Sequence, residues 1–166
     1  MSDSWHSLLS QKLALARALL IRSSQATSQV DADASGALAG EACRQGAIEL
    51  ILRARRLLLT MIARLYQQRH AEPVSLDEIR TLTGDGNPDV EQLVELARTP
   101  GSWWHHLDQL EHGQSHPPAA RKTVSADNII AVARETGPDR SEAALLETLK
   151  ALKAFADELS ERHGEW

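Results

Sequence analysis

The chain has 166 residues, of which 42% are hydrophobic and 25% charged, and its formal net charge is −5. This length suits one domain, residues 1–166, with enough chain to bury a real core. The negative charge argues against nucleic acid or an anionic membrane as the default partner. The single cysteine, Cys43, excludes an internal disulfide framework and fits a reducing cytoplasm.

The first predicted helix runs from about Trp5 to Ser28. Steps of three and four join the apolar residues of its seam: Trp5, Leu9, Leu13, Ala16 and Leu20. The chain start carries no basic region, and Lys12 and Arg17 interrupt the apolar run that follows. We therefore expect neither a signal peptide nor a membrane span. Small polar residues at 30–36 predict a short turn, so the first two helices should be antiparallel neighbours.

The second predicted helix, Leu38 to His70, is the longest element, and Pro73 is expected to end it. Apolar residues cover well over half of its circumference, and they include Ile48, Leu50, Ile51, Leu52, Leu57, Leu58, Leu59, Met61 and Ile62. A helix that is apolar around most of its surface must pack against more than one neighbour. We therefore expect the other helices to be arranged around it.

Two charged residues fall on the apolar face of this helix. Arg55 lies at its middle, and we expect it to pair within the fold, because buried ions are usually paired. Glu41 lies near the helix start, and antiparallel pairing brings Arg22 close to it. We therefore predict an Arg22–Glu41–Arg44 cluster at the loop end of the first two helices.

The remaining strip of the long helix is basic and includes Arg53, Arg56 and Arg64. Residues 41–70 hold six Arg against two Glu, whereas residues 75–111 hold eight Asp and Glu against two Arg. One interpretation is that the strip pairs with this acidic segment or faces water. The other is that it holds an anionic ligand or an acidic partner.

Three short helices are predicted to follow. Ser75 and Glu78 have capping-box spacing, and Asn87-Pro88 combines a cap residue with a first-turn proline. Thr99-Pro100 repeats this device and opens a helix to about Gly113. An irregular connection is expected at about 114–126, then a short helix at 128–134, and a last helix over Ser141–Arg162. The fold class is therefore all-α: an antiparallel helical bundle with a long central helix and a covering arm of short helices.

His105, Asp108 and His112 are a candidate metal site. Their spacing of three and four places them on one side of a helix. Imidazole and carboxylate are real ligands of zinc and other divalent ions. The spacing matches no recognised signature, and the alternative is a solvated polar face. We expect no cofactor.

Trp104, together with Trp103, is a candidate partner-binding anchor, because tryptophan is enriched among the residues that dominate interface energies. The alternative is that Trp103 pins the arm to the core while Trp104 half-covers a seam between helices. Arg53 and Arg56 are the other candidates for partner binding.

Arg64 and His70 have a spacing that resembles the Arg/His pair of the helical nucleotide-binding ribonuclease superfamily found in higher eukaryotes and prokaryotes. That resemblance implies RNA cleavage with these two as catalytic residues. Leu65 stands where the superfamily usually has a polar residue, and an arginine near a helix C-terminus is also expected from the helix dipole.

Four segments together resemble an uncharacterised proteobacterial family of small helical proteins: Gln11–Arg17, the Glu41-Ala42 start of the apolar helix, Leu93–Ala97 and Asn128–Val132. The likeness spans nearly the whole chain and implies no activity. We therefore expect a bacterial, cytoplasmic, non-enzymatic protein that acts through protein–protein interaction or self-association, with no nucleic acid or membrane partner. A nucleotide- or RNA-acting bundle and a metal-binding helical protein are the alternatives.

Overall fold

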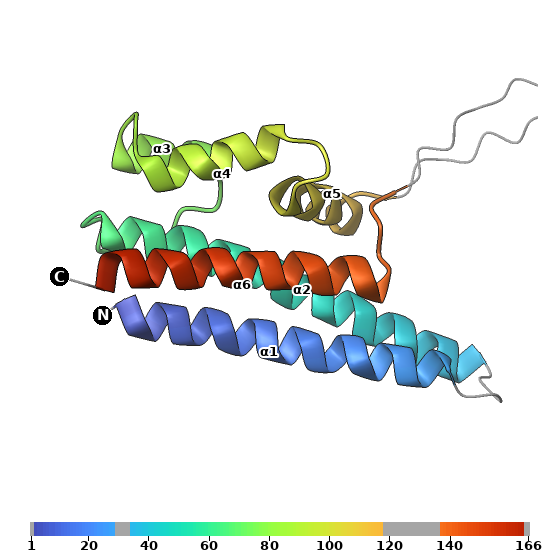
Figure 1. Ribbon diagram of the computed structural model, residues 1–166. Coiled ribbons are helices and arrows are strands. Elements are labelled where there is room, and N and C mark those ends of the chain that lie inside the picture. The colour runs from blue at the N-terminus through green and yellow to red at the C-terminus, as the bar shows by residue number, and fades with distance from the viewer. Residues whose placement is uncertain (1, 29–33, 118–136, 165–166) are drawn as a thin grey trace, which may run out of the picture.

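The computed structural model describes residues 2–28, 34–117 and 137–164, and every regular element in these ranges is a helix. The predicted all-α class is confirmed. Helices α1 (Ser2–Thr27) and α2 (Ala34–Leu65) form a long antiparallel hairpin, and α6 (Glu142–Gly164) packs along it (Figure 1). Helices α3 (Leu76–Thr83), α4 (Pro88–Arg98) and α5 (Trp103–Ser115) form a second layer over α2 and α6. None of the described helices combines the length and apolarity needed to cross a membrane.

Helix α2 is the centre of the core, as its wide apolar face predicts. It contacts α1, α3, α5 and α6, and a long series of its side chains is at most 1% exposed, namely Ala47, Ile48, Ile51, Ala54, Leu58, Leu59, Met61, Ile62 and Ala63. Leucines of α1, α4, α5 and α6 complete this cluster. Burial on several sides explains why one helix carries so much apolar surface.

Two glycines allow α1 and α2 to approach closely. A Cβ atom on Gly40 would lie 3.0 Å from Cγ2 of Thr27, and one on Gly46 would lie 3.1 Å from Cδ1 of Leu19. The Ser23 hydroxyl donates a hydrogen bond of 2.7 Å to the carbonyl of Gly40. These contacts fix the antiparallel register of the hairpin.

Helix α2 ends at Leu65, eight residues before Pro73, so the prediction that proline ends it is wrong. Gln67 adopts a φ of 66°, the left-handed region. Its N–H donates to the carbonyl of Arg64, and the N–H of Gln68 donates to the carbonyl of Ala63. This pair of bonds is the Schellman arrangement, which satisfies the last carbonyls of a helix. The position usually holds glycine, and its absence hid the helix end in the sequence.

The arm helices begin largely at the residues that the capping patterns indicate. The Ser75 hydroxyl accepts from the N–H of Glu78, and the Asn87 side chain accepts from the N–H groups of Asp89 and Val90. The predicted start at Thr99-Pro100 is wrong, because Ser102 caps α5 and Thr99 is the C-cap residue of α4. Gly101, with a φ of 80°, makes the turn between the two helices.

Glu41 pairs with Arg44 at 2.9 Å and with Arg140, which lies just before α6. Arg22 is exposed and forms no ion pair with a described residue, so the predicted Arg22–Glu41–Arg44 cluster is wrong in one member. The packing of α6 on the hairpin supplies Arg140 instead, and local sequence could not show this.

Of the predicted connection at 114–126, residues 114 and 115 belong to α5. The predicted helix at 128–134 lies outside the described residues.

Candidate functional site

Arg55 joins the hairpin to α5. Only 9% of the residue is exposed. Its guanidinium donates to Asp108 at 2.7 Å and to Glu111 at 3.2 Å, and its Cζ lies 5.5 Å from the ring centroid of Trp104. Burial raises the pKa of the Asp108 carboxyl above its ordinary value, although Arg55 opposes the shift. The expectation that Arg55 pairs within the fold is confirmed.

Trp104 is 3% exposed, so its ring faces the core and Arg55 rather than solvent. Trp103 is half-buried, and its ring centroid lies 5.5 Å from that of Trp104 and 5.8 Å from that of Phe155 in α6. Both rings therefore hold α5 against α2 and α6. The arrangement leaves the Trp104 ring unavailable to a partner in this conformation.

The three metal candidates are not brought together. One carboxylate oxygen of Asp108 accepts a hydrogen bond from Arg55, and the ring of His112 stacks on that of His116 with centroids 4.1 Å apart. Among the described residues, no three His, Cys, Asp or Glu side chains are grouped as a metal site would require. His106, which was not among the candidates, instead ties α5 to α6 through the Thr148 hydroxyl at 2.6 Å and the Asp139 carbonyl at 2.8 Å.

Arg64 and His70 also lie apart in their contacts: Arg64 packs on α1, and His70 is exposed. The Arg64 guanidinium carbon lies 5.3 Å above the ring of Trp5 in α1, a cation–π contact. His70 is exposed, beyond the end of α2. No hydrogen bond joins these two described side chains, and their ribonuclease-like role stays a prediction.

A buried carboxylate that sequence reasoning missed lies where α2 and α6 end and α4 begins. The Asp89 side chain is 1% exposed. It accepts from the Tyr66 hydroxyl at 2.8 Å, from Arg162 at 2.6 Å and from Nε2 of His163 at 2.9 Å. Because a carboxylate only accepts, His163 must carry a proton on Nε2. Burial first, and then the bond to Asp89, raises the pKa of Tyr66 to about 12.

All of these donors are directed at one carboxylate, so the group acts as a clasp between three elements; the term Asp89 clasp below means Asp89, Tyr66, Arg162 and His163. Its members are up to 97 positions apart in the chain (66 to 163). No local spacing could therefore have revealed it.

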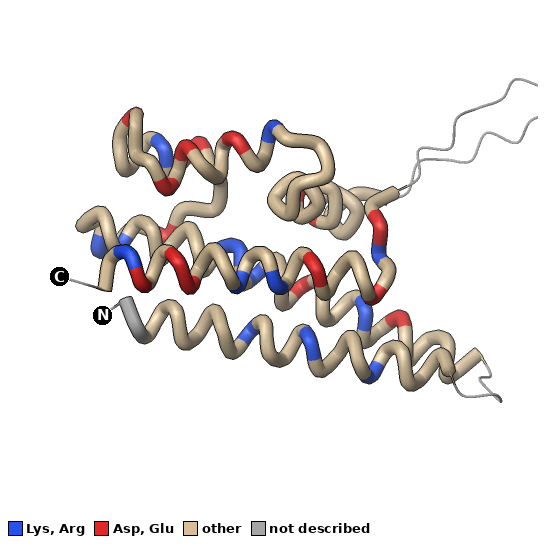
Figure 2. Tube along the Cα trace, in the orientation of Figure 1, with Lys and Arg blue, Asp and Glu red and all other residues tan. Residues whose placement is uncertain are grey.

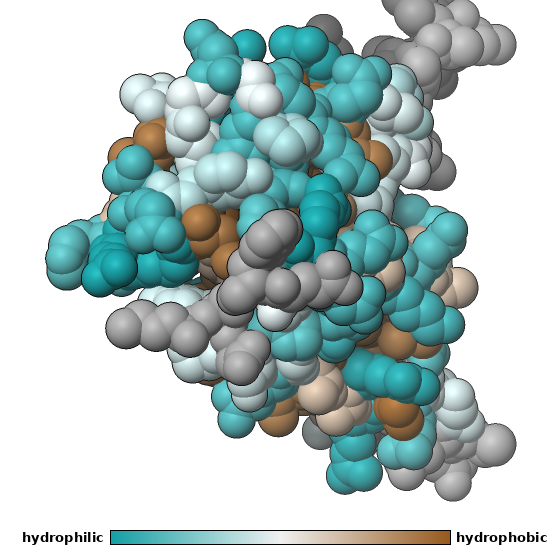
Figure 3. All heavy atoms as spheres, turned by 60° about the vertical axis from the view of Figure 1, so that its left-hand side comes forward, coloured by the Kyte–Doolittle hydropathy of each residue, from teal (hydrophilic) through white to brown (hydrophobic). Residues whose placement is uncertain are grey.

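The end of the molecule that holds both termini is mostly hydrophilic, with small separate apolar patches (Figure 3).

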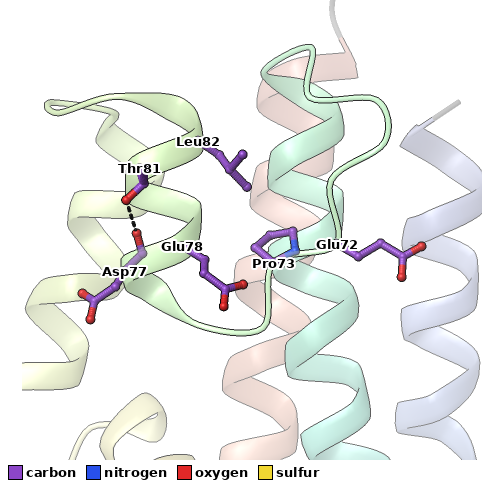
Figure 4. A pocket seen from close by; sticks show the side chains of 6 residues that line it. All are labelled: Glu72, Pro73, Asp77, Glu78, Thr81 and Leu82. Carbon is purple, nitrogen blue, oxygen red and sulfur yellow. Dashed lines mark hydrogen bonds between the residues drawn. The ribbon is translucent and has the colours of Figure 1, made fainter.

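A hollow of about 470 Å³ lies beside α3. Its lining includes the carboxylates of Glu72, Asp77 and Glu78 together with Pro73 and Leu82. Figure 4 shows that these carboxylates point in different directions. Glu78 is also occupied locally, because it accepts from the N–H of Val74 at 2.9 Å. The hollow therefore presents no convergent set of ligands.

The described residues are layered by charge. Residues 2–28 and 34–65, which hold the two hairpin helices, carry eight Lys and Arg against three Asp and Glu, and residues 66–117 carry three Arg against nine Asp and Glu. Figure 2 shows the same separation between α1 and the arm. This separation of charge attracts the arm to the hairpin, and Arg55 and Arg56 both form ion pairs with Glu111 in α5. Arg53 points elsewhere: it is exposed and forms no ion pair with a described residue.

One side of the hairpin is left uncovered by the other described helices. His6 and Ser24, about five turns apart on one edge of α1, bond to Asp157 and Glu142 of α6. The opposite edge of α1 and the adjoining edge of α2 form what we call the side face: Trp5, Leu8, Lys12, Leu15, Leu19 and Arg22 with Gly46, Leu50, Arg53, Leu57 and Arg64. In Figure 1 the hairpin has α3–α6 on one side only.

Register places these residues in levels across the two helices. Leu19 lies opposite Gly46. Antiparallel helices advance at the same rise, so Leu15 lies level with Leu50, and Lys12 with Arg53. Continuing along the hairpin brings Leu8 level with Leu57, and the contact of Trp5 with Arg64 closes the series. One basic level, Lys12–Arg53, therefore lies between the Leu15–Leu50 and Leu8–Leu57 levels, and Arg64 lies on Trp5 at the end of the series.

The side face is partly open to solvent. Leu15 is 48% exposed, and Leu8, Leu19, Leu50 and Leu57 are half-buried. On each helix, the residues recur at steps of three and four or at their sum, the spacing that interlocks with another helix. Among described residues, neither Lys12 nor Arg53 forms an ion pair.

Residues 1–166 match a family of unknown function. The chain belongs to the DUF6586 family. No curated protein and no solved structure matches this DUF6586 chain. The expectation of an uncharacterised family of helical proteins is confirmed, while its proteobacterial origin stays a prediction.

Membership in DUF6586 brings no activity and no functional residue with it. Arg55 and the Asp89 clasp have their charges paired, whereas on the side face Leu15 is exposed, and Lys12 and Arg53 form no ion pair with a described residue.

Proposed function

We propose that this DUF6586 protein is a non-enzymatic helical protein that acts by binding another protein through the side face of its α1–α2 hairpin. The observation that carries the proposal is the exposure of Leu15, 48%, at the centre of an apolar series with helix-packing periodicity. A cytoplasmic location is part of the proposal, since the one thiol, Cys43, is unpaired.

The arrangement of the other candidates favours this function over catalysis. Asp108 and Asp89, two of the carboxylates that pair with arginine in the fold, each accept from side chains of their own chain. Arg64 lies on Trp5, and this contact orients it independently of His70. The side face groups several partly exposed leucines, whereas the exposed Ile21, Leu38 and Val74 lie outside it. Burial of such a group is the main driving force of association.

A photo-reactive amino acid at position 15 tests the proposal in the cells that make the protein. The matched control carries it at Gln92, an exposed position of α4. We expect a defined adduct at position 15, and we expect the purified adduct partner to bind the wild-type protein but not Leu15→Ser. Equal adducts at both positions, or a reconstituted complex that tolerates Leu15→Ser, would contradict the proposal.

A further inference from the structure

We infer that the partner of the side face is an acidic amphipathic helix of another protein, rather than a second copy of this chain. The inference rests on the proposed function, because it names the class of partner for the same surface. It starts from the charges of the side face. The four charged residues that belong to it are basic, namely Lys12, Arg22, Arg53 and Arg64, and the exposed Glu49 lies at its border, one turn from Arg53.

Charge complementarity excludes the simplest self-association. A two-fold dimer through this surface would bring the Lys12–Arg53 level of one copy onto the same face of the other, where every charged side chain is basic. Like charges placed opposite one another in a partly dry interface are unfavourable. An acidic partner reverses the sign of that contribution.

The levels define what the partner must present. Lys12 and Arg53 face each other across the hairpin, between the Leu15–Leu50 level and the Leu8–Leu57 level. A helix laid along the hairpin would therefore place apolar side chains on both leucine levels and a carboxylate between them. A nucleic-acid strand is a poor match, because its charged phosphates would leave the leucine levels without an apolar counterpart.

The partner's charge would act against the overall field of the protein. The chain has a net charge of −5, so non-specific attraction favours a basic peptide. Preference for an acidic helix can then arise only from a local basic surface. This property separates the inference from simple electrostatic adhesion.

Two designed helical peptides of about four heptads test the inference. They share leucines at the packing positions and carry either Glu or Lys at the position that meets Lys12 and Arg53. Binding to the full-length protein is measured by NMR titration at low and high salt. We expect the Glu peptide to bind more tightly, with shifts in residues 8–19 and 46–57, and to weaken as salt rises.

Charge reversal supplies the decisive comparison. Arg53→Glu should weaken the Glu peptide by roughly tenfold, and Lys12→Glu/Arg53→Glu should reverse the preference to the Lys peptide. The matched control is Arg17→Glu, the same charge change at an exposed position on the other edge of α1, and it should leave both affinities unchanged. Circular dichroism verifies that each variant is folded.

The inference would be overturned by equal binding of both peptides, by binding of neither, by preference for the Lys peptide, or by a dimer in light scattering that Arg53→Glu strengthens. Tighter binding of a DNA or RNA oligonucleotide than of the Glu peptide would also overturn it. A specific adduct at position 15 alongside any of these results would leave the proposed function standing. Absence of the adduct would remove both.

Discussion

Asp89 shows what a single buried carboxylate does in this fold. Its side chain, 1% exposed, accepts from residues at the ends of α2 and α6. Removing one partner of a buried ion pair leaves the other without compensation, which costs more than the pair contributes when intact. The exposure of Arg162, 45% of its side chain, moderates that cost.

Asp89→Asn should lower the free energy of unfolding by about 2 kcal/mol and the melting temperature by roughly 4–8 °C. The amide keeps the shape but removes the charge that Arg162 faces. Urea titration monitored by circular dichroism measures the change. The control is Asp85→Asn, in the turn just before α4, which should have little effect because the Asp85 side chain is 88% exposed. Equal effects of both variants would show that the clasp contributes nothing special.

Tyr66 reports on the same clasp, and it is the only tyrosine in the chain. Its pKa is about 12 in the fold, and about 10 in the unfolded chain. Because its pKa is higher in the fold, the protonated Tyr66 contributes its full stabilisation of the fold below a pH of about 10, and this contribution is lost as the pH rises through 12. The absorbance of tyrosinate should therefore titrate with a midpoint near 12 in the folded protein and near 10 in urea. A midpoint near 10 in protein that circular dichroism shows to be folded would refute the placement of the half-buried Tyr66 hydroxyl against Asp89.

At the scale of the helices, Arg55 connects α2 to α5 through ion pairs with Asp108 and Glu111. Arg55→Ala should lower the free energy of unfolding by about 2 kcal/mol, because Asp108 and Glu111 lose their buried partner. Arg53→Ala, two positions away and exposed, should change it by less than about 0.5 kcal/mol. Chemical denaturation compares the two. Similar losses would mean that any arginine on α2 stabilises the fold by general attraction to the acidic arm.

The end of α2 yields a prediction of opposite sign. Gln67 occupies the left-handed region, where residues with a side chain are disfavoured and glycine is not. Gln67→Gly should therefore raise the free energy of unfolding by up to about 1 kcal/mol. A loss of stability on thermal or urea unfolding would show that the Gln67 side chain contributes more than its backbone strain costs.

The elements that sequence could locate are those with local signals. Ser75 and Asn87 announce helix starts because their capping partners are two or three residues away. The end of α2 lacks the usual glycine, and the start of α5 depends on Gly101 and Ser102 rather than on Thr99-Pro100. The end of α2 was misplaced because Gln67 occupies the position where glycine is usual, and the start of α5 because Ser102, near Thr99, is the actual cap residue.

For the molecule as a whole, periodicity predicted the architecture because α2 must be covered on several sides. Pairing across the fold was harder to foresee. Arg55 could be identified as a paired charge, but not the identity of its partners. The Asp89 clasp depends on how elements distant in the sequence pack together, and so does the pairing of Glu41 with Arg140 where Arg22 was expected. Spacing along the chain does not encode such packing.

The side face is a property of the whole fold as well. Its residues were visible in the sequence as leucines beside the main seam of α1 and as the excess apolar girth of α2. Their common exposure follows only from α3–α6 covering the opposite side of the hairpin (Figure 1). The proposed interaction and the inferred acidic partner both depend on that asymmetry.

Thiol accessibility at position 15 tests this openness most directly. Leu15→Cys and Leu20→Cys are made in a Cys43→Ala background, so that each protein carries one thiol. Leu15 is 48% exposed and Leu20 is 1% exposed. The thiol at position 15 should react at nearly the rate of an unfolded peptide at every protein concentration, and the thiol at position 20 only through unfolding. Equal protection of both thiols in the folded monomer would contradict an open side face.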